Sequence, residues 1–123
     1  MYDMSTRLME STKGTRAMNG PWSSVIDDMP HSRFLYREDG NHAQLVYRVN
    51  GSRLILTHTE TPEALRGRGI AGRLVRAAVE RAAATGETVV PWCPYARKWL
   101  EDHPDDAARI AIDWSSLPAA RPL

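Results

Sequence analysis

The feature that most constrains this chain is the glycine-rich segment Arg66–Arg73, which stands between a strand-like run and an apolar helical repeat. The run before it, residues 54–59, is typical of a β-strand, and apolar residues at 70, 74, 78 and 82 recur with helical spacing after it. The order of elements is therefore strand, loop, glycines and helix. The first backbone N–H groups of a helix have no partner within the helix. Because such a helix start binds anions without a special side chain, the segment predicts a cradle for phosphate groups.

Length and charge limit the number of domains and the kinds of partner that the chain can have. The 123 residues, 42% of them hydrophobic, predict one domain with a modest core. A net charge of +1 gives no global reason to expect nucleic-acid or membrane binding. The positive charge is local instead, since the segment 66–81 contains only one acid, Glu80, and five arginines, at 66, 68, 73, 76 and 81. We expect the first three arginines near phosphate, and the last two, Arg76 and Arg81, on a solvated helix face.

The single cysteine, Cys93, excludes an internal disulfide and a multi-cysteine metal site. It fits a reducing compartment, so a cytoplasmic location is expected. No apolar run approaches the ~20 residues that cross a bilayer, and the N-terminal residues lack the apolar core of a signal peptide. We expect a flexible extension over residues 1–24, a folded domain over 25–112 and a loose tail over 113–123.

The local patterns predict three antiparallel strands, over residues 32–37, 42–49 and 52–59. Turns are expected at Glu38–Gly40 and at Asn50–Gly51, the second a type I′ hairpin turn. A helix over 70–84 should be capped by Gly86, and a strand over 88–90 must then pair in parallel because a crossover helix precedes it. A second helix follows Pro94 over 95–102. The expected fold class is α/β (α+β), with a mostly antiparallel four-stranded sheet, one parallel pair and two main helices.

The glycines can be read in two frames. Gly67-x-Gly69-x-x-Gly72 matches the dinucleotide fingerprint, but a Rossmann unit needs glycines at the very end of a strand and an acidic residue about 20 positions later. Here residues 60–66 intervene, and residues 91–93 are Pro-Trp-Cys. Read one residue earlier, Arg66-x-x-Gly69-x-Ala71 resembles the acetyl-coenzyme A signature of the GNAT N-acetyltransferases.

This resemblance covers Arg33 to about Asp105 and is closest to the minimal, single-domain YjdJ-type N-acetyltransferase subfamily. It rests on five marks: Arg33-Phe34, Leu54-Ile55-Leu56-Thr57-His58-Thr59, Pro62-Glu63-Ala64-Leu65-Arg66-Gly67-Arg68-Gly69-Ile70-Ala71, Pro91-Trp92-Cys93-Pro94-Tyr95 and His103-Pro104. Thr61 departs from the aliphatic residue expected there. The chain is also too short for the further elements that help to form the acceptor groove in full-size GNAT enzymes.

The resemblance implies a minimal GNAT-like fold and transfer of acetyl from acetyl-CoA to an amine, which is a protein lysine, an N-terminus or a small amine. It implies that the pantetheine arm inserts between two splayed strands. The cofactor-binding residues that it indicates lie in the loop, beside the splay and on the second helix: Arg66, Gly67, Arg68, Gly69, Ile70, Ala71, Gly72, Arg73, Thr59, Glu60, Thr61, Pro94 and Arg97.

His58 is the expected general base, because an amine acceptor must lose a proton and histidine titrates near neutral pH. The alternative is a buried, hydrogen-bonded histidine, since strand alternation would place it on one face with Leu54 and Leu56. Glu60 and Glu63 are reserve bases.

Cys93 precedes a helix, where the thiolate form is favoured. It is a candidate acetyl carrier, a candidate acid for the departing thiolate, or a small packing residue. Tyr95 is a second candidate acid or a packing residue against the pantetheine. Lys98, like Arg97, either reaches the ligand's phosphates or faces water, and Trp99 is most simply a core residue.

His31 and His42 show no metal-ligand spacing, so no metal is expected. Two rival functions remain: a non-catalytic CoA-binding module, which is a sensor or carrier, and a nucleic-acid-binding domain that uses the arginines. The acceptor and the oligomeric state are not specified by the sequence.

Overall fold

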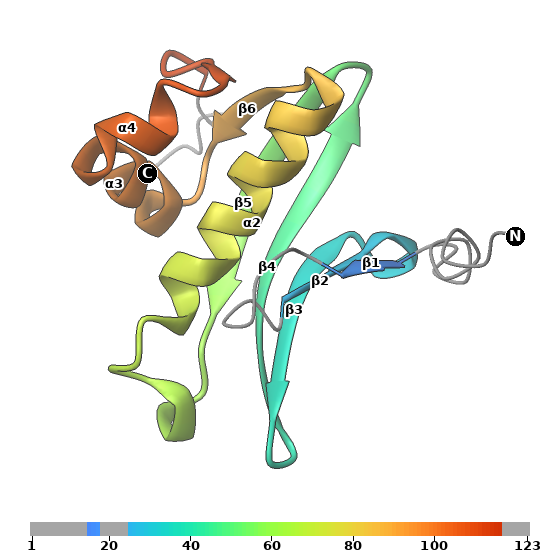
Figure 1. Ribbon diagram of the computed structural model, residues 1–123, viewed down its shortest axis with the longest axis vertical. Helices are drawn as coiled ribbons and strands as arrows, with labels where there is room; N and C mark the ends of the chain where they lie inside the picture. Colours follow the sequence, from blue (N-terminus) through green and yellow to red (C-terminus); the bar gives the residue numbers. More distant parts are fainter. Residues whose placement is uncertain (1–14, 18–24, 117–123) are drawn as a thin grey trace, which may run out of the picture.

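The computed structural model describes residues 15–17 and 25–116 (Figure 1). The expected extension and tail therefore lie mostly outside the described residues, which include only 15–17 of the first and 113–116 of the second. The elements in chain order are β1 (Thr15–Ala17), β2 (Ile26–Asp28), the 3₁₀ helix η1 (Met29–His31), β3 (Arg33–Glu38), β4 (Asn41–Asn50), β5 (Arg53–Glu60), the 3₁₀ helix η2 (Glu63–Leu65), α2 (Ile70–Thr85), β6 (Thr88–Pro91), α3 (Pro94–Asp102), α4 (Pro104–Ala107) and β7 (Ala111–Ile112).

The strands of the described residues form one sheet in the order β1-β2-β3-β4-β5-β6-β7. Pairing is antiparallel from β1 to β5 and parallel between β5 and β6. The predicted fold class is thus confirmed. The short strands β1, β2 and β7 extend the four that were expected, and β7 adds a second parallel pairing, with β6.

The two central hairpins differ in their turns. Asp39 and Gly40 join β3 to β4 with φ of 49° and 79°, the pattern of a type I′ turn. The predicted type I′ turn at Asn50–Gly51 is wrong by one residue, because Asn50 stays in β4 and pairs with Arg53. The loop is therefore Gly51–Ser52, and only Gly51 has a positive φ, of 63°, as in a type II′ turn.

The long helix α2 crosses one face of the sheet (Figure 1). Its apolar stripe, which includes Leu74, Ala78 and Ala82, is fully or almost fully buried with the inward side chains of β3, β4 and β5. Gly86 ends the helix with φ of 82° and donates its N–H to the carbonyl of Ala82 at 2.8 Å, so the predicted cap is confirmed. Helix α3 packs on the same face, where Trp99 and Leu100 join this core.

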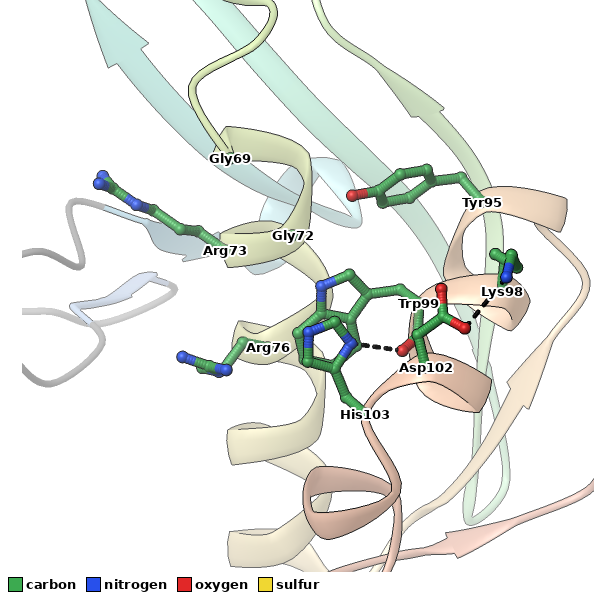
Figure 2. A pocket seen from close by; sticks show the side chains of 9 residues that line it. All are labelled: Gly69, Gly72, Arg73, Arg76, Tyr95, Lys98, Trp99, Asp102 and His103. Atoms are coloured by element: carbon green, nitrogen blue, oxygen red, sulfur yellow. Dashed lines mark hydrogen bonds and ion pairs between the residues drawn. The ribbon is translucent and has the colours of Figure 1, made fainter.

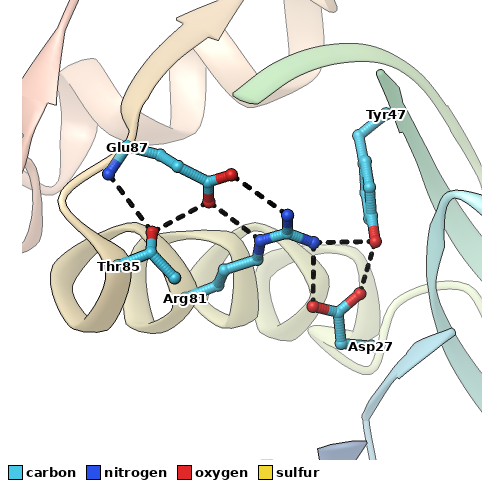
Figure 3. A network of polar contacts seen from close by, with 5 residues as sticks. All are labelled: Asp27, Tyr47, Arg81, Thr85 and Glu87. Atoms are coloured by element: carbon cyan, nitrogen blue, oxygen red, sulfur yellow. Dashed lines mark hydrogen bonds and ion pairs between the residues drawn. The ribbon is translucent and has the colours of Figure 1, made fainter. Parts of the chain in front are cut away.

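Arg81, near the end of α2, does not face water as the charge pattern suggested. Only 13% of its side chain is exposed. Its guanidinium donates to Asp27 at 3.0 Å, to the Tyr47 hydroxyl at 2.8 Å and to Glu87 at 2.9 Å (Figure 3). The expectation of a solvated Arg81 is wrong because Asp27, 54 residues away in the sequence, and Glu87, just beyond the end of α2, converge on it. The resulting network ties β2 to α2.

Candidate active site

The loop between β5 and α2 is shaped by two glycines in the left-handed region. Gly67 has φ of 77° and Gly69 has φ of 75°, a conformation that glycine adopts without a steric penalty. A Cβ at either position would meet no atom within 4 Å, so the backbone here is open to a close neighbour. Gly69 is the N-cap of α2, and no side chain of the described residues caps the helix. The first-turn N–H groups are therefore available to an anion.

The arginines of this region differ in what holds them. Arg66 donates to the carbonyl of Thr61 at 3.0 Å, and Arg68 makes a two-pronged contact with Glu38, with both N–O distances 2.8 Å. Arg73 has no carboxylate partner among the described residues and lies over the Tyr36 ring, 5.9 Å from its centroid. Of the three loop arginines expected near phosphate, Arg73 thus has the least committed charge.

A cavity of about 430 Å³ lies between α2 and α3 (Figure 2). Arg76 lies over the Trp99 ring at 5.5 Å, and the Trp99 and His103 rings stack with centroids 3.8 Å apart. The wall is therefore both basic and aromatic. The lining residues are Gly69, Gly72, Arg73, Arg76, Tyr95, Lys98, Trp99, Asp102 and His103.

Gly72 has a second role, which concerns packing. A Cβ at this position would lie 2.8 Å from Trp99 Nε1, closer than side-chain carbons come to other atoms. The absence of a side chain lets the indole lie directly on α2. The third glycine of the motif therefore sets the distance between the two helices that form the cavity.

Strands β5 and β6 part beyond the pair Leu56–Pro91. The N–H of Cys93 donates to the carbonyl of Leu56 at 2.8 Å, which fixes the start of α3 against β5. Beyond this point β5 continues to Glu60 while the chain from Cys93 turns into α3. The Thr59 hydroxyl and the buried Cys93 thiol lie 3.1 Å apart on the inner side of this divergence.

A β-bulge at Thr57 changes the face on which His58 lies. Val46 pairs with His58 and Tyr47 with Leu56, which leaves Thr57 as the extra residue. His58 therefore shares the face of Val46, opposite to the core residues Leu45 and Tyr47, and 59% of its side chain is exposed. The alternative of a buried His58 beside Leu54 and Leu56 is wrong, because it assumed unbroken alternation.

His58 and Glu60 form a pair on this outer face, with Nε2 and Oε2 3.1 Å apart. The second Glu60 oxygen accepts from the Gln44 amide at 2.8 Å. These hydrogen bonds, from Gln44 and His58, lower the pKa of Glu60 and keep it a carboxylate. An imidazole beside a fixed carboxylate is an arrangement suited to proton transfer.

The start of α3 carries the other predicted residues. Tyr95 reaches from α3 toward the first turn of α2 (Figure 2), and partial desolvation of this exposed side chain together with the charge of a Cys93 thiolate raises its pKa. Pro94 is exposed at the first position of α3. Arg97 donates to the carbonyl of Trp114 at 2.6 Å and does not line the cavity, whereas Lys98 does.

Within residues 15–17 and 25–116 no group of three or more His, Cys, Asp or Glu side chains is arranged to hold a metal ion. No helix in this part of the chain is long and apolar enough to cross a membrane.

The sequence and the fold of this chain match known proteins. A family model described as GCN5-related N-acetyl-transferase matches residues 33–110, which run from β3 past α4. This chain belongs to the GCN5-related N-acetyltransferase family. It is 36% identical to protein NATD1 of Gallus gallus over 83 residues, which are 65% of this chain and 76% of the chicken protein. The identity to protein NATD1 of Homo sapiens is also 36%, over 65% of this chain and 74% of the human protein.

A solution structure from Staphylococcus aureus, described as GCN5-like, shares the fold with a TM-score of 0.54 at 21% identity. The match covers 81% of this chain and 92% of the other. The cradle, the strand divergence and the outer His58–Glu60 pair all lie inside the family match, whereas β1 and β2 lie outside it.

Sequence reasoning missed part of the cavity of this family member. Arg76 is exposed and Trp99 belongs to the core, as expected, but the sequence did not indicate that both also line the cavity. The spacing of Tyr95, Trp99 and His103, four residues apart on one face of the chain, was the signal that could have brought them together. Gln44 carried no such signal, because its contact with Glu60 depends on strand register.

Proposed function

We propose that this family member transfers acetyl from acetyl-CoA to an amine acceptor. The observation that carries the proposal is the uncapped start of α2 beside a basic cavity of about 430 Å³. Backbone N–H groups and the helix dipole favour a pyrophosphate at this position. The same loop follows directly on the end of β5, where the strands part.

The residues present fit this ligand. Open glycine backbone at 67 and 69 would accept the pyrophosphate, and Arg73, which has no carboxylate partner among the described residues, would supply positive charge. The stacked Trp99 and His103 rings offer an aromatic wall against which the nucleobase of the cofactor would stack. The diverging β5 edge over residues 57–60 would receive the extended arm.

When bound, acetyl-CoA supplies an activated acetyl thioester. Because α2 and α3 cover the inner face, the acceptor approaches from the outer face, where His58 and Glu60 are exposed. There His58 takes the proton that the acceptor nitrogen must lose. The phenol of Tyr95 is protonated at neutral pH, so in this scheme Tyr95 gives its proton to the departing thiolate.

In this scheme Cys93 has a structural role: its backbone hydrogen bond to Leu56 and its thiol contact with Thr59 hold the start of α3 against β5. The free thiol also supports a cytoplasmic location as part of the proposal. The acceptor is an amine of a protein or of a small molecule.

Titration calorimetry with acetyl-CoA tests the binding step. Wild-type protein should bind, and Gly69→Pro should abolish binding, because proline cannot adopt the left-handed conformation and removes an N–H donor. No heat at near-millimolar acetyl-CoA would overturn the proposal.

Transfer to amine acceptors separates an enzyme from a CoA-binding sensor or carrier. The double variant His58→Ala/Cys93→Ala should bind acetyl-CoA but lose transfer by about 100-fold or more. Binding without transfer by the wild-type protein to any lysine peptide, N-terminal peptide or small amine would favour the non-catalytic module.

A further inference from the structure

Five polar side chains form a continuous hydrogen-bonded row across the outer face of the sheet. The row starts on β2 and ends at the candidate base on β5. Its members, from the sheet edge inward, are Asp28, Arg33, Gln44, Glu60 and His58.

Strand register brings the row together. Asp28 pairs directly with Arg33, and Gln44 pairs directly with Glu60. Arg33 lies opposite Val46, so Gln44 is its diagonal neighbour on the same face. The bulge at Thr57 completes the row, because it moves His58 to this face.

Each contact has hydrogen-bond length. Arg33 Nε donates to Asp28 Oδ2 at 2.9 Å and Arg33 Nη1 donates to Gln44 Oε1 at 3.0 Å. Gln44 Nε2 donates to Glu60 Oε1 at 2.8 Å, and His58 Nε2 lies 3.1 Å from Glu60 Oε2. The row becomes more exposed toward its end, from 11% of the side chain at Asp28 to 59% at His58.

The chemistry of the groups fixes the direction of every bond. A guanidinium can only donate, so Gln44 must turn its oxygen toward Arg33 and its NH₂ toward Glu60. A carboxylate can only accept, so His58 must carry its hydrogen on Nε2. In neutral His58 the unprotonated ring nitrogen is then Nδ1.

We propose that Gln44, oriented by Arg33, is a positioning residue that holds Glu60 and thereby sets the tautomer of His58, so that Nδ1 accepts the proton of the acceptor amine. The proposal rests on the proposed transferase function for its last step. In that step the proton leaves the acceptor nitrogen for Nδ1 as the nitrogen forms its bond to the acetyl carbon. The carbon–sulfur bond breaks, and coenzyme A leaves as a thiolate that takes the proton of the Tyr95 hydroxyl.

The row is anchored outside the part of the chain that matches the family. Asp28 lies on β2, whereas the family match begins at Arg33. The added strand therefore contributes to the site through side chains and not only through sheet pairing.

The test is ¹⁵N NMR of the His58 ring, combined with steady-state kinetics of the full chain. Wild-type protein should show the Nε2–H tautomer at neutral pH. Gln44→Glu keeps the size of the side chain and its contact with Arg33 but replaces the donor with an acceptor, so Glu60 loses its partner. The tautomers should then mix, and kcat should fall by about tenfold, a part of the 10²–10⁴ range of a general base, with KM for acetyl-CoA changed less than about twofold.

The swapped double variant Gln44→Glu/Glu60→Gln provides the decisive comparison. In this variant the carboxylate introduced at position 44 accepts from Arg33 and from the amide NH₂ introduced at position 60. The amide oxygen at position 60 accepts from His58, so every donor again meets an acceptor. The Nε2–H tautomer should return. A residue with a merely structural role would not give this reversal.

Arg48→Leu is the matched control, since Arg48 is exposed on the same face of β4 but lies outside the row. It should leave both the ring signals and kcat unchanged. An unaltered tautomer in Gln44→Glu, or an altered tautomer with full kcat, would overturn the inference. Failure of the wild-type protein to bind acetyl-CoA in calorimetry would instead overturn the proposed function, while the NMR comparison still decides whether the row sets the tautomer.

Discussion

The indole nitrogen of Trp99 lies 2.8 Å from the point that a Cβ at position 72 would occupy. Gly72 and Trp99 therefore pack directly against each other where α2 and α3 meet at the cavity wall. Two opposing effects decide what a methyl group at position 72 would do. Alanine is favoured over glycine in a helix by about 1 kcal/mol, but overpacking a well-packed contact costs about 1–3 kcal/mol.

We therefore expect Gly72→Ala to destabilise the protein by roughly 1 kcal/mol and to weaken acetyl-CoA binding, because the indole must move. Urea unfolding and calorimetry measure the two effects. In a Trp99→Leu background the clash is gone, so the same Gly72→Ala change should stabilise the protein. A stabilising effect in the wild-type background would contradict the contact.

Removal of Arg81 should have a large effect on stability. Asp27 is 3% exposed and Glu87 is 12% exposed, so Arg81→Met leaves two carboxylates in a poorly hydrated site. Breaking a buried pair in this way costs about 3–5 kcal/mol. Chemical denaturation of Arg81→Met should show this loss.

Arg109→Met is the control for Arg81, since its pair with Glu80 is 41% exposed on both sides. Its loss should cost about 0.2–1 kcal/mol. If Arg81→Met does not fold, the milder Tyr47→Phe still removes one hydrogen bond to Asp27 and should lower the stability by about 1–3 kcal/mol. Equal losses of stability in Arg81→Met and Arg109→Met would show that the buried network stabilises the protein no more than an exposed ion pair does.

Arg73 should matter more for acetyl-CoA affinity than Arg68. Because Arg73 has no carboxylate partner among the described residues and lines the cavity, Arg73→Ala should weaken binding by about tenfold or more, as expected for a hydrogen bond to a charged group. Calorimetry gives the dissociation constant. The comparison is Arg68→Met/Glu38→Gln, which removes the neutralised pair and should change affinity less than about threefold. A larger loss from this pair would assign the phosphate contact to Arg68.

The lowered pKa of Asp113 predicts how the stability of the protein depends on pH. Hydrogen bonds from Arg53 and Ser115 lower the pKa of Asp113 to about 2 from an ordinary value of 3.8. The folded state therefore binds this proton more weakly than the unfolded state, so the contribution is fully present above about pH 4 and is lost as the pH falls toward 2. The Tm difference between wild type and Asp113→Asn should be positive at about pH 6 and shrink to zero near pH 2. A difference that persists at pH 2 would exclude the carboxylate as its source.

Local signals were sufficient for the main elements of the fold. The stripe of Leu74, Ala78 and Ala82 predicted α2, and Gly86 predicted where it ends, because both depend on residues within one or two turns. The parallel pairing of β6 followed from the crossover helix that precedes it. These features need no knowledge of distant contacts.

The site was less predictable, because its contacts join residues far apart in the chain. Arg81 finds Asp27 at a separation of 54 residues, and Gln44 finds Glu60 through strand register. The side of the sheet on which His58 lies depends on the extra residue Thr57, and simple alternation along the strand does not predict such a bulge. Gly67 and Gly69 shape the predicted loop through their positive φ, but the packing of Gly72 against Trp99 required the second helix.

The bulge at Thr57 also limits how this strand can change during evolution. Before it, Leu54 and Leu56 point their side chains into the core under α2, and residues after it show the opposite phase. Substitutions can alter one position at a time, whereas a change that brought Thr57 into regular pairing, with no residue lost, would turn His58 inward and Thr59 outward together. The bulge, as much as the composition of β5, is therefore under selection if both faces are to keep their roles.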